Sequence, residues 1–247
     1  MKLYEHERLD TLIKENIQII QSKKVFSFSL DAVLLAHFAE LPRNKKACIL
    51  DACSGNGAVA FMISAKTNNP IYAIEYQEIL ADMAQRTVTL NHLEDRVKII
   101  HGDYNDAQKW FDRGSVDVIT CNPPYFTTED YANIHEENAI ALARHELTIT
   151  LDEWVSTSSQ LLKNGGKLYC VHRPDRLLQL LTVLKSHQLV PKKMCFVHPK
   201  KEKDANMVLI EAVKQGKEKG IKIIPPIIVF NEKNEYIEPV RSILYGE

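Results

Sequence analysis

Residues 116–125 read VDVITCNPPY, an apolar run that ends in two consecutive prolines. A short apolar run of this kind is typical of a buried strand. Proline has no N–H to donate to a sheet, so the strand ends before Pro123, and Asn122 is held in an extended conformation. The pattern therefore predicts a stiff corner at the carboxyl end of a strand, which is where ligands bind in open α/β sheets.

Short apolar runs and segments with helical spacing alternate on both sides of this corner. Predicted strands cover residues 47–50, 71–74, 97–100, 115–121, 167–171, 190–198 and 205–213. Predicted helices cover residues 58–66, 77–91, 151–162 and 174–187. The alternation predicts an α/β fold, a doubly wound and mostly parallel Rossmann-like sheet of about seven strands. Because no helix separates the last two strands, they are expected to form an antiparallel hairpin at the C-terminal edge.

One segment precedes this pattern and one follows it, so the chain is expected to have three parts. Residues 1–44 are expected to form an N-terminal extension on the ligand side, with a helical turn and then a strand ending near Gln21, followed by a helix over residues 32–41. Residues 45–214 form the main domain, and residues 215–247 form a tail packed on it.

The charge of the chain is nearly balanced but unevenly distributed, with 31 Lys and Arg against 32 Asp and Glu. Residues 185–222 contain ten lysines and four acidic residues, a net charge of +6 that leaves about −7 on the rest. This distribution predicts a local basic surface for a polyanion.

Cysteine usage and the N-terminus predict a soluble cytoplasmic protein. The five cysteines are scattered without a C-x-x-C pair, which favours reduced thiols and no metal site. The first ten residues, MKLYEHERLD, carry charges where a signal peptide has an apolar run, and no apolar run reaches membrane-spanning length. We expect no membrane partner and a monomer.

A glycine-rich turn, DACSGNG at residues 51–57, follows the first predicted strand of the main domain. Glycine permits a positive φ and lets a ligand approach the backbone, and the next helix presents its positive N-terminal end there. The turn predicts ligand binding by Asp51, Cys53, Gly55 and Gly57. Its spacing, with Ala60, also fits a relaxed dinucleotide fingerprint, so an NAD-dependent oxidoreductase and a plain strand-to-helix turn both stay open.

Two acidic residues follow the next two strands. Glu75 comes eighteen residues after Gly57, the position from which a carboxylate accepts hydrogen bonds from ribose hydroxyls. Asp103 is placed to accept from an adenine amine, with Tyr104 packing on the ring. The alternative for both acids is a solvated charge.

The glycine turn, the two acids and the proline corner follow four successive strands, an arrangement that resembles class I S-adenosylmethionine-dependent methyltransferases. The resemblance implies S-adenosylmethionine as cofactor, with Asn122 also bordering it. The sequence Asn122, Pro123, Pro124, Tyr125 resembles the signature of enzymes that methylate amino groups on planar acceptors.

The chemistry expected of this corner follows from the acceptor. An adenine amino nitrogen is a poor nucleophile because its lone pair is delocalised into the ring. The carboxamide oxygen of Asn122 and the carbonyl of Pro123 are expected to accept its two N–H groups and aim the lone pair at the methyl group. Tyr125 is expected to stack on the base.

Further segments resemble bacterial tRNA (adenine-N6)-methyltransferases that act beside the anticodon of a valine tRNA. These segments are ERLD at 7–10, IIQS at 19–22, FSFSLD at 26–31, ARHE at 143–146 and HRP at 172–174. The family pattern implies that Phe28 and Asp31 border the cofactor pocket, where the alternative is a core aromatic and a helix cap. The sequence departs from the family in having Asp-Ala-Cys where many relatives have Asp-Leu-Gly or Asp-Leu-Cys, but both later glycines are present.

A tRNA partner gives the basic region a role. Phosphate contacts are expected from the following cationic residues: Lys192, Lys193, Lys200, Lys201, Lys203, Arg144 and Arg173. Lysines on an edge strand also prevent aggregation, which is the alternative for the hairpin residues. For Arg144 and Arg173 the alternative is a structural role, bracing the loop after Tyr125. The loop 126–138 is expected to act as a substrate lid.

Other activities remain open from the sequence alone. A methyltransferase of the same fold acting on a protein glutamine or on guanine N2 shares the proline corner. A non-catalytic RNA-binding module on this scaffold is a further alternative.

Overall fold

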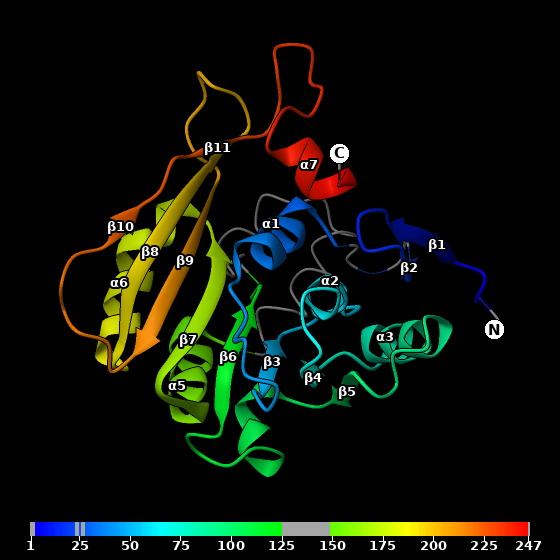
Figure 1. Cartoon of the computed structure of the whole chain (residues 1–247), viewed down its shortest axis with the longest axis horizontal. Helices are drawn as coiled ribbons and strands as arrows, with labels where there is room; N and C mark the ends of the chain where they lie inside the picture. Colours follow the sequence, from blue (N-terminus) through cyan, green and yellow to red (C-terminus); the bar gives the residue numbers. More distant parts are fainter. Residues whose placement is uncertain (1–2, 23–24, 26–27, 125–148, 247) are drawn as a thin grey trace.

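The computed structural model describes residues 3–22, 25, 28–124 and 149–246. Its centre is a nine-stranded sheet with the strand order β10-β8-β9-β7-β6-β3-β4-β5, in which β11 also pairs with β8. The seven longer strands are β3 (Ile49–Ala52), β4 (Ile71–Glu75), β5 (Val97–His101), β6 (Val116–Cys121), β7 (Leu162–His172), β8 (Leu189–His198) and β9 (Met207–Lys214). The mostly parallel sheet confirms the predicted fold class (Figure 1).

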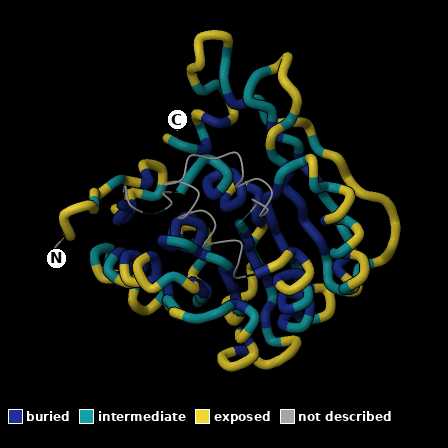
Figure 2. Tube along the Cα trace, turned by 180° about the vertical axis from the view of Figure 1, so that it is seen from behind, coloured by how far each residue is buried: buried dark blue, intermediate teal, exposed yellow. Residues whose placement is uncertain are grey.

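Helices cover both faces of the sheet. On one face lie α1 (Leu30–Phe38), α2 (Ala58–Ser64), α3 (Glu78–Leu90) and α7 (Val240–Tyr245). On the other lie the 3-10 turns η1 (Tyr104–Lys109) and η3 (Pro174–Arg176) with α5 (Leu151–Leu161) and α6 (Leu177–Ser186). Each layer buries its own apolar cluster against the sheet, and the central strands β3, β4 and β6 between them are almost wholly buried (Figure 2).

The C-terminal hairpin differs from the prediction in one respect. β9 runs antiparallel to both β7 and β8, as expected, but β8 is not the free edge. The short strands β10 (Lys222–Ile223) and β11 (Ile227–Ile228) pair with β8 in parallel. The tail thus covers part of the edge that the hairpin alone would have exposed, and edge protection is shared between its backbone and the lysines.

The prediction of a helical turn at the N-terminus is wrong. β1 (Glu7–Leu12) and β2 (Ile17–Ser22) form an antiparallel hairpin, and Asn16 in the turn has a φ of 55°. The apolar residues of β1 are Leu9 and Leu12, a spacing of three that fits a helical turn, so the strand is decided by its pairing with β2 and not by its own pattern. The hairpin packs on α3, where the N–H of Ile20 donates to Thr87 Oγ1 at 3.1 Å.

Candidate active site

The register of the parallel strands brings the predicted ligand residues to one edge. Ala52 at the end of β3 is paired with Ile74 of β4 and with Cys121 of β6. Glu75 is paired with His101 at the end of β5. The residues that follow these strands therefore meet at the carboxyl edge, as the sequence predicts.

Asp51 lies beneath this edge and is 1% exposed. Its carboxylate accepts a hydrogen bond from Thr120 Oγ1 at 2.7 Å and one from the N–H of Ala60 at 3.2 Å. Burial raises the pKa of Asp51 to about 7, although both hydrogen bonds favour the charged form. Asp51 thus ties β3 to β6 and to the first turn of α2.

The turn after Asp51 needs glycine at two positions for different reasons. Gly57 has a φ of 85°, and a Cβ there would lie 2.7 Å from the ring of Phe61. Gly55 has a φ of 59° and open space around its missing Cβ, so a ligand has room to approach its backbone. Cys53 also has a positive φ, 54°, although it is not glycine.

Glu75 holds the turn against β4. Its carboxylate is 4% exposed and accepts the N–H of Gly55 at 2.7 Å and that of Gln77 at 2.8 Å. Burial raises the pKa of Glu75, and the two backbone hydrogen bonds oppose that rise. A carboxylate has about four acceptor sites, so hydroxyl donors of a ligand still have acceptors here.

Asp103 and Tyr104, which are predicted to hold an adenine, differ in their surroundings. Asp103 is half-buried and caps η1 by accepting the N–H of Asn105 at 2.8 Å. Tyr104 is 3% exposed in the core beside α5, with its hydroxyl 2.9 Å from Ser158 Oγ. The structure therefore turns the Tyr104 ring into the core, and its packing on a ligand stays a prediction.

Two residues that were not predicted from the sequence lie shortly after Glu75, one directly after it and one in the first turn of α3. Tyr76 is 53% exposed and Ile79 is 61% exposed, so both side chains are accessible to a ligand. Their signal in the sequence is bulky apolar residues in the first turn after the acidic strand end. They are candidates for the apolar walls of a ring-binding pocket.

The proline corner extends β6. Pro123 is buried, Asn122 and Pro124 are half-buried, and Tyr125 lies outside the described residues. Arg144, the ARHE segment and the loop 126–138 lie outside them as well.

Phe28 is half-buried and packs against the core of the α1 layer, with its N–H donating to Gln21 Oε1 at 3.1 Å. The Asp31 carboxylate accepts a hydrogen bond from Ser29 Oγ, and Ser29 directly precedes the first residue of α1.

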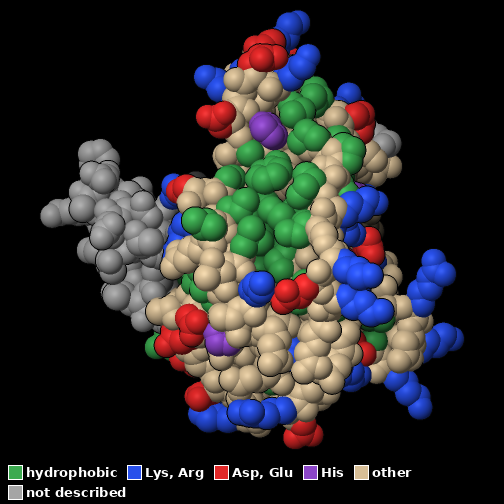
Figure 3. Space-filling model, turned by 90° about the vertical axis from the view of Figure 1, so that its left-hand side faces the viewer, with side chains coloured by type: hydrophobic (Ala, Val, Ile, Leu, Met, Phe, Trp, Pro, Cys, Tyr) green, Lys and Arg blue, Asp and Glu red, His purple; other side chains and the backbone are tan. Residues whose placement is uncertain are grey.

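The predicted phosphate-binding lysines do not form one cluster. Lys193 points toward α1, where it pairs with Glu40 and lies 3.6 Å from Glu211. Lys192 donates to backbone carbonyls of the tail, and Lys200 donates to the carbonyl of Glu232 at 3.2 Å. Lys201 and Lys203 are exposed in the β8–β9 loop, and Arg173 pairs with Asp175 at 2.6 Å. Figure 3 shows the left-hand side of Figure 1, where cationic side chains are dispersed around an exposed apolar area.

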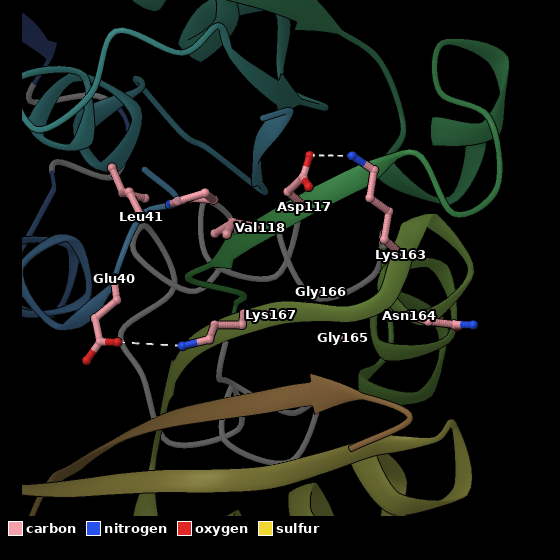
Figure 4. Close-up of a pocket in the computed structure, with 10 residues that line it drawn as sticks. Glu40, Leu41, Asp117, Val118, Lys163, Asn164, Gly165, Gly166 and Lys167 are labelled. Carbon is pink, nitrogen blue, oxygen red and sulfur yellow. Dashed lines mark hydrogen bonds and ion pairs between the residues drawn. The ribbon is translucent and has the colours of Figure 1, made fainter. Parts of the chain in front are cut away.

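A cavity of about 320 Å³ lies at the opposite end of β6 and β7 (Figure 4). Asp117 and Lys163 pair across 2.6 Å on its wall, and Glu40 pairs with Lys167 at 3.5 Å. The cavity contains none of the predicted ligand residues. Its charges are already paired, so we do not assign it to the reaction.

The described residues contain no group of three or more His, Cys, Asp or Glu side chains arranged to hold a metal ion. No helix in the described part of the chain is both long enough and apolar enough to span a membrane.

The strand order, with a glycine turn, two acids and a proline corner at the carboxyl ends of β3 to β6, defines a class I methyltransferase fold. The chain belongs to the methyltransferase small domain family, whose model matches residues 16–196.

Similar proteins agree with this assignment. The tRNA1(Val) (adenine(37)-N6)-methyltransferase of Actinobacillus succinogenes is 29% identical over 209 residues, which cover 83% of each chain. A crystal structure described as that of a predicted O-methyltransferase from Agrobacterium tumefaciens superposes with a TM-score of 0.67 at 20% identity, covering 87% of this chain and 95% of that one. Geranyl diphosphate C-methyltransferase of Streptomyces coelicolor, solved with S-adenosyl-L-homocysteine, has a TM-score of 0.56 at 15% identity, covering 75% and 77%.

Proposed function

We propose that this protein transfers the methyl group of S-adenosylmethionine to N6 of an adenosine in tRNA, beside the anticodon of a valine tRNA. The observation that carries the proposal is the position of Asn122. It directly follows Cys121, whose register partner Ala52 belongs to the glycine-rich stretch 51–57. An acceptor held at the corner would therefore lie beside a ligand held by the turn. The activity named for the Actinobacillus succinogenes relative supports the choice of acceptor.

The residues at this edge fit the cofactor. Ser54 Oγ is buried without a hydrogen-bond partner among the described residues, and the backbone of Gly55 is open to a ligand. Ser54 and the turn amides would hold the methionine part, and Glu75 would accept from the ribose. Asp103 would accept from the adenine amine, with Tyr76 and Ile79 beside the ring.

S-adenosylmethionine, when bound, supplies an electrophilic methyl group on a sulfonium. The chain's own part is to orient the acceptor nitrogen. Asn122 Oδ1 and the Pro123 carbonyl accept its two N–H groups, which favours a pyramidal nitrogen with its lone pair free. The two prolines keep this pair of acceptors rigid. No strong base is required, because an N–H of the methylated nitrogen is acidic and its proton passes to water.

The test is methylation of a defined RNA. The protein is incubated with isotope-labelled S-adenosylmethionine and valine tRNA transcripts that carry adenosine or guanosine at position 37, the site named for the relative. We expect N6-methyladenosine by nucleoside mass spectrometry in the first transcript only.

Two results would contradict the proposal. The first is a protein that binds S-adenosylhomocysteine but leaves a matched tRNA pool unmethylated. The second is label on guanine or on a protein glutamine, which would identify one of the alternative acceptors. Stabilisation by NAD and not by S-adenosylhomocysteine in a thermal shift would indicate an oxidoreductase.

A further inference from the structure

Two thiols meet at the junction between the glycine turn and the proline corner. Cys53 follows β3 and belongs to the turn, and Cys121 ends β6 directly before Asn122. Ala52 and Cys121 are register partners in the pair of strands β3 and β6. Cys53 follows Ala52, so it lies diagonally across from Cys121, offset by one residue along the strand direction. With strands about 4.8 Å apart and an advance of about 3.3 Å per residue, this offset corresponds to a Cα separation of about 6 Å. Disulfides most often have a separation of this size.

The backbone of Cys53 directs its side chain toward Cys121. In a continuing strand, Cys53 would point to the face opposite Ala52 and Cys121. Its positive φ of 54° ends the strand, and the side chain packs against the core cluster that contains Cys121 and Cys170. Cys53 lies near enough to Cys121 to influence the pKa of its thiol. A left-handed conformation costs a non-glycine residue about 1 kcal/mol, so the local sequence does not favour this placement by itself.

The two thiols differ in access. Cys53 is partly exposed, whereas Cys121 and Cys170 are buried. Burial raises the pKa of Cys121, and the neighbouring Cys53 adds to that rise. An oxidant from solvent therefore reaches Cys53 first. Cys121 is the nearer of the two buried thiols, because β6 lies between β3 and β7.

We propose that Cys53 and Cys121 are a thiol-oxidation site that forms a disulfide with a peroxide and thereby switches off the cofactor site. Cys53 Sγ attacks a peroxide oxygen, the O–O bond breaks, and a sulfenic acid and one water form. Cys121 Sγ then attacks the Cys53 sulfur, the S–O bond breaks, and the leaving hydroxide takes the Cys121 proton as a second water. Two thiols are oxidised to one disulfide while one peroxide is reduced.

The disulfide would act on the turn through its hydrogen bonds. The Ser54 N–H bonds the carbonyl of Ile74 at 3.0 Å, and the Gly55 N–H bonds Glu75 at 2.7 Å. A bond of about 2.05 Å between the two Sγ atoms would tie Cys53, the residue directly before these contacts, to the end of β6 and so restrict the turn. The loss of methyl transfer rests on the proposed function, but the formation of the bond does not.

The bond is tested by peptide mapping of the full-length chain. Trypsin leaves Cys48 and Cys53 on one peptide, residues 47–66, so a Cys48→Ala background makes the assignment unique. This protein is treated with hydrogen peroxide, blocked with N-ethylmaleimide and digested without reductant. We expect residues 47–66 joined to residues 114–144, the peptide of Cys121, and released by dithiothreitol.

A join between residues 114–144 and residues 168–176, the peptide of Cys170, would overturn the proposal. Added oxygen on an unjoined Cys53 would overturn it as well, as would no change at all. The Cys195→Ala variant is the matched control, because Cys195 lies in the other core cluster, and it should form the same joined peptide.

The effect on the site is measured on the same oxidised sample. We expect at least a tenfold loss of S-adenosylhomocysteine affinity and of methyl transfer, both restored by dithiothreitol. Full affinity in quantitatively joined protein would overturn the switch. If the reduced protein transfers no methyl group to tRNA, the proposed function fails, while the mapping result and the affinity change still decide this inference.

Discussion

At the scale of single residues, the site depends on polar groups whose orientation is fixed by neighbours. Asp51 and Glu75 are both buried, and both accept backbone N–H groups. Their positions at the carboxyl ends of β3 and β4 were predictable because the apolar pattern of each strand ends there. Their partners were not, because Thr120 is 69 residues away from Asp51 in the chain.

Asn122→Ala is expected to abolish methyl transfer without weakening the cofactor site. Loss of one oriented acceptor costs about 100- to 1000-fold in the rate of the chemical step. The affinity for S-adenosylhomocysteine should stay close to the wild-type value by calorimetry. Asn122→Asp, which keeps an acceptor oxygen, serves as the control and should retain part of the activity. Wild-type turnover by Asn122→Ala would refute the role assigned to this carboxamide.

Asp51→Asn is expected to change how stability depends on pH. The pKa of Asp51 is raised from 3.8 in the unfolded chain to about 7 in the folded one, so the folded protein holds this proton more tightly. Between these values stability falls as pH rises, by on the order of 3 kcal/mol from this group. Urea unfolding at pH 5 and pH 8 should show that fall in the wild type and a smaller one in the variant. Exposed Asp112→Asn should behave like the wild type, and equal slopes for all three proteins would contradict the assignment.

At the scale of elements, the turn between β3 and α2 shows how a local motif and a distant contact act together. Gly57 needs a positive φ, which the motif predicts, and it also needs space beside Phe61 in the next helical turn. The space beside Gly57 is limited because the turn holds the first residues of α2 close to the Gly57 backbone.

Gly57→Ala is expected to lower the free energy of unfolding by roughly 2–4 kcal/mol and to weaken cofactor binding. The substitution adds strain at φ 85° to a Cβ contact of 2.7 Å with Phe61. Gly114→Ala is the matched control, because Gly114 has a φ of 64° but no neighbour within 4 Å. The control should lose about 1 kcal/mol in urea unfolding and no cofactor affinity. Equal losses for both variants would show that the Phe61 contact contributes nothing.

At the scale of the whole molecule, the segments outside the alternating pattern join the same cores. Val240 and Ile243 of α7 lie in the cluster that also holds α1 and α2, and β10 and β11 extend the sheet beyond β8. The N-terminal hairpin is fixed to α3, where Glu7 pairs with Arg86. Residues far apart in sequence thus support the elements that carry the site.

Val240→Ala is expected to destabilise the whole molecule by roughly 1–3 kcal/mol, since the side chain is 0% exposed. Because Val240 shares its core with α1 and α2, fluorescence and circular dichroism should report one common, shifted urea transition. Ile223→Ala in the tail, where the side chain is 56% exposed, should change stability by less than about 0.5 kcal/mol. A separate early transition for Val240→Ala would show that the tail unfolds on its own.

The sequence by itself determined the parallel sheet, the glycine turn and the proline corner. Each depends on a short run of residues: alternating apolar segments, glycines with positive φ, and prolines that end a strand. The ends of β3 to β6 then had to meet, because parallel strands align their carboxyl ends.

The tertiary structure alone decided which distant groups touch. It formed the β1–β2 hairpin, placed the tail on β8, turned Tyr104 into the core, separated the lysines and brought Cys53 to Cys121. These outcomes depend on register and packing between segments remote in sequence. A period of two or of 3.6 residues describes which side of an element is buried, but not what it is buried against.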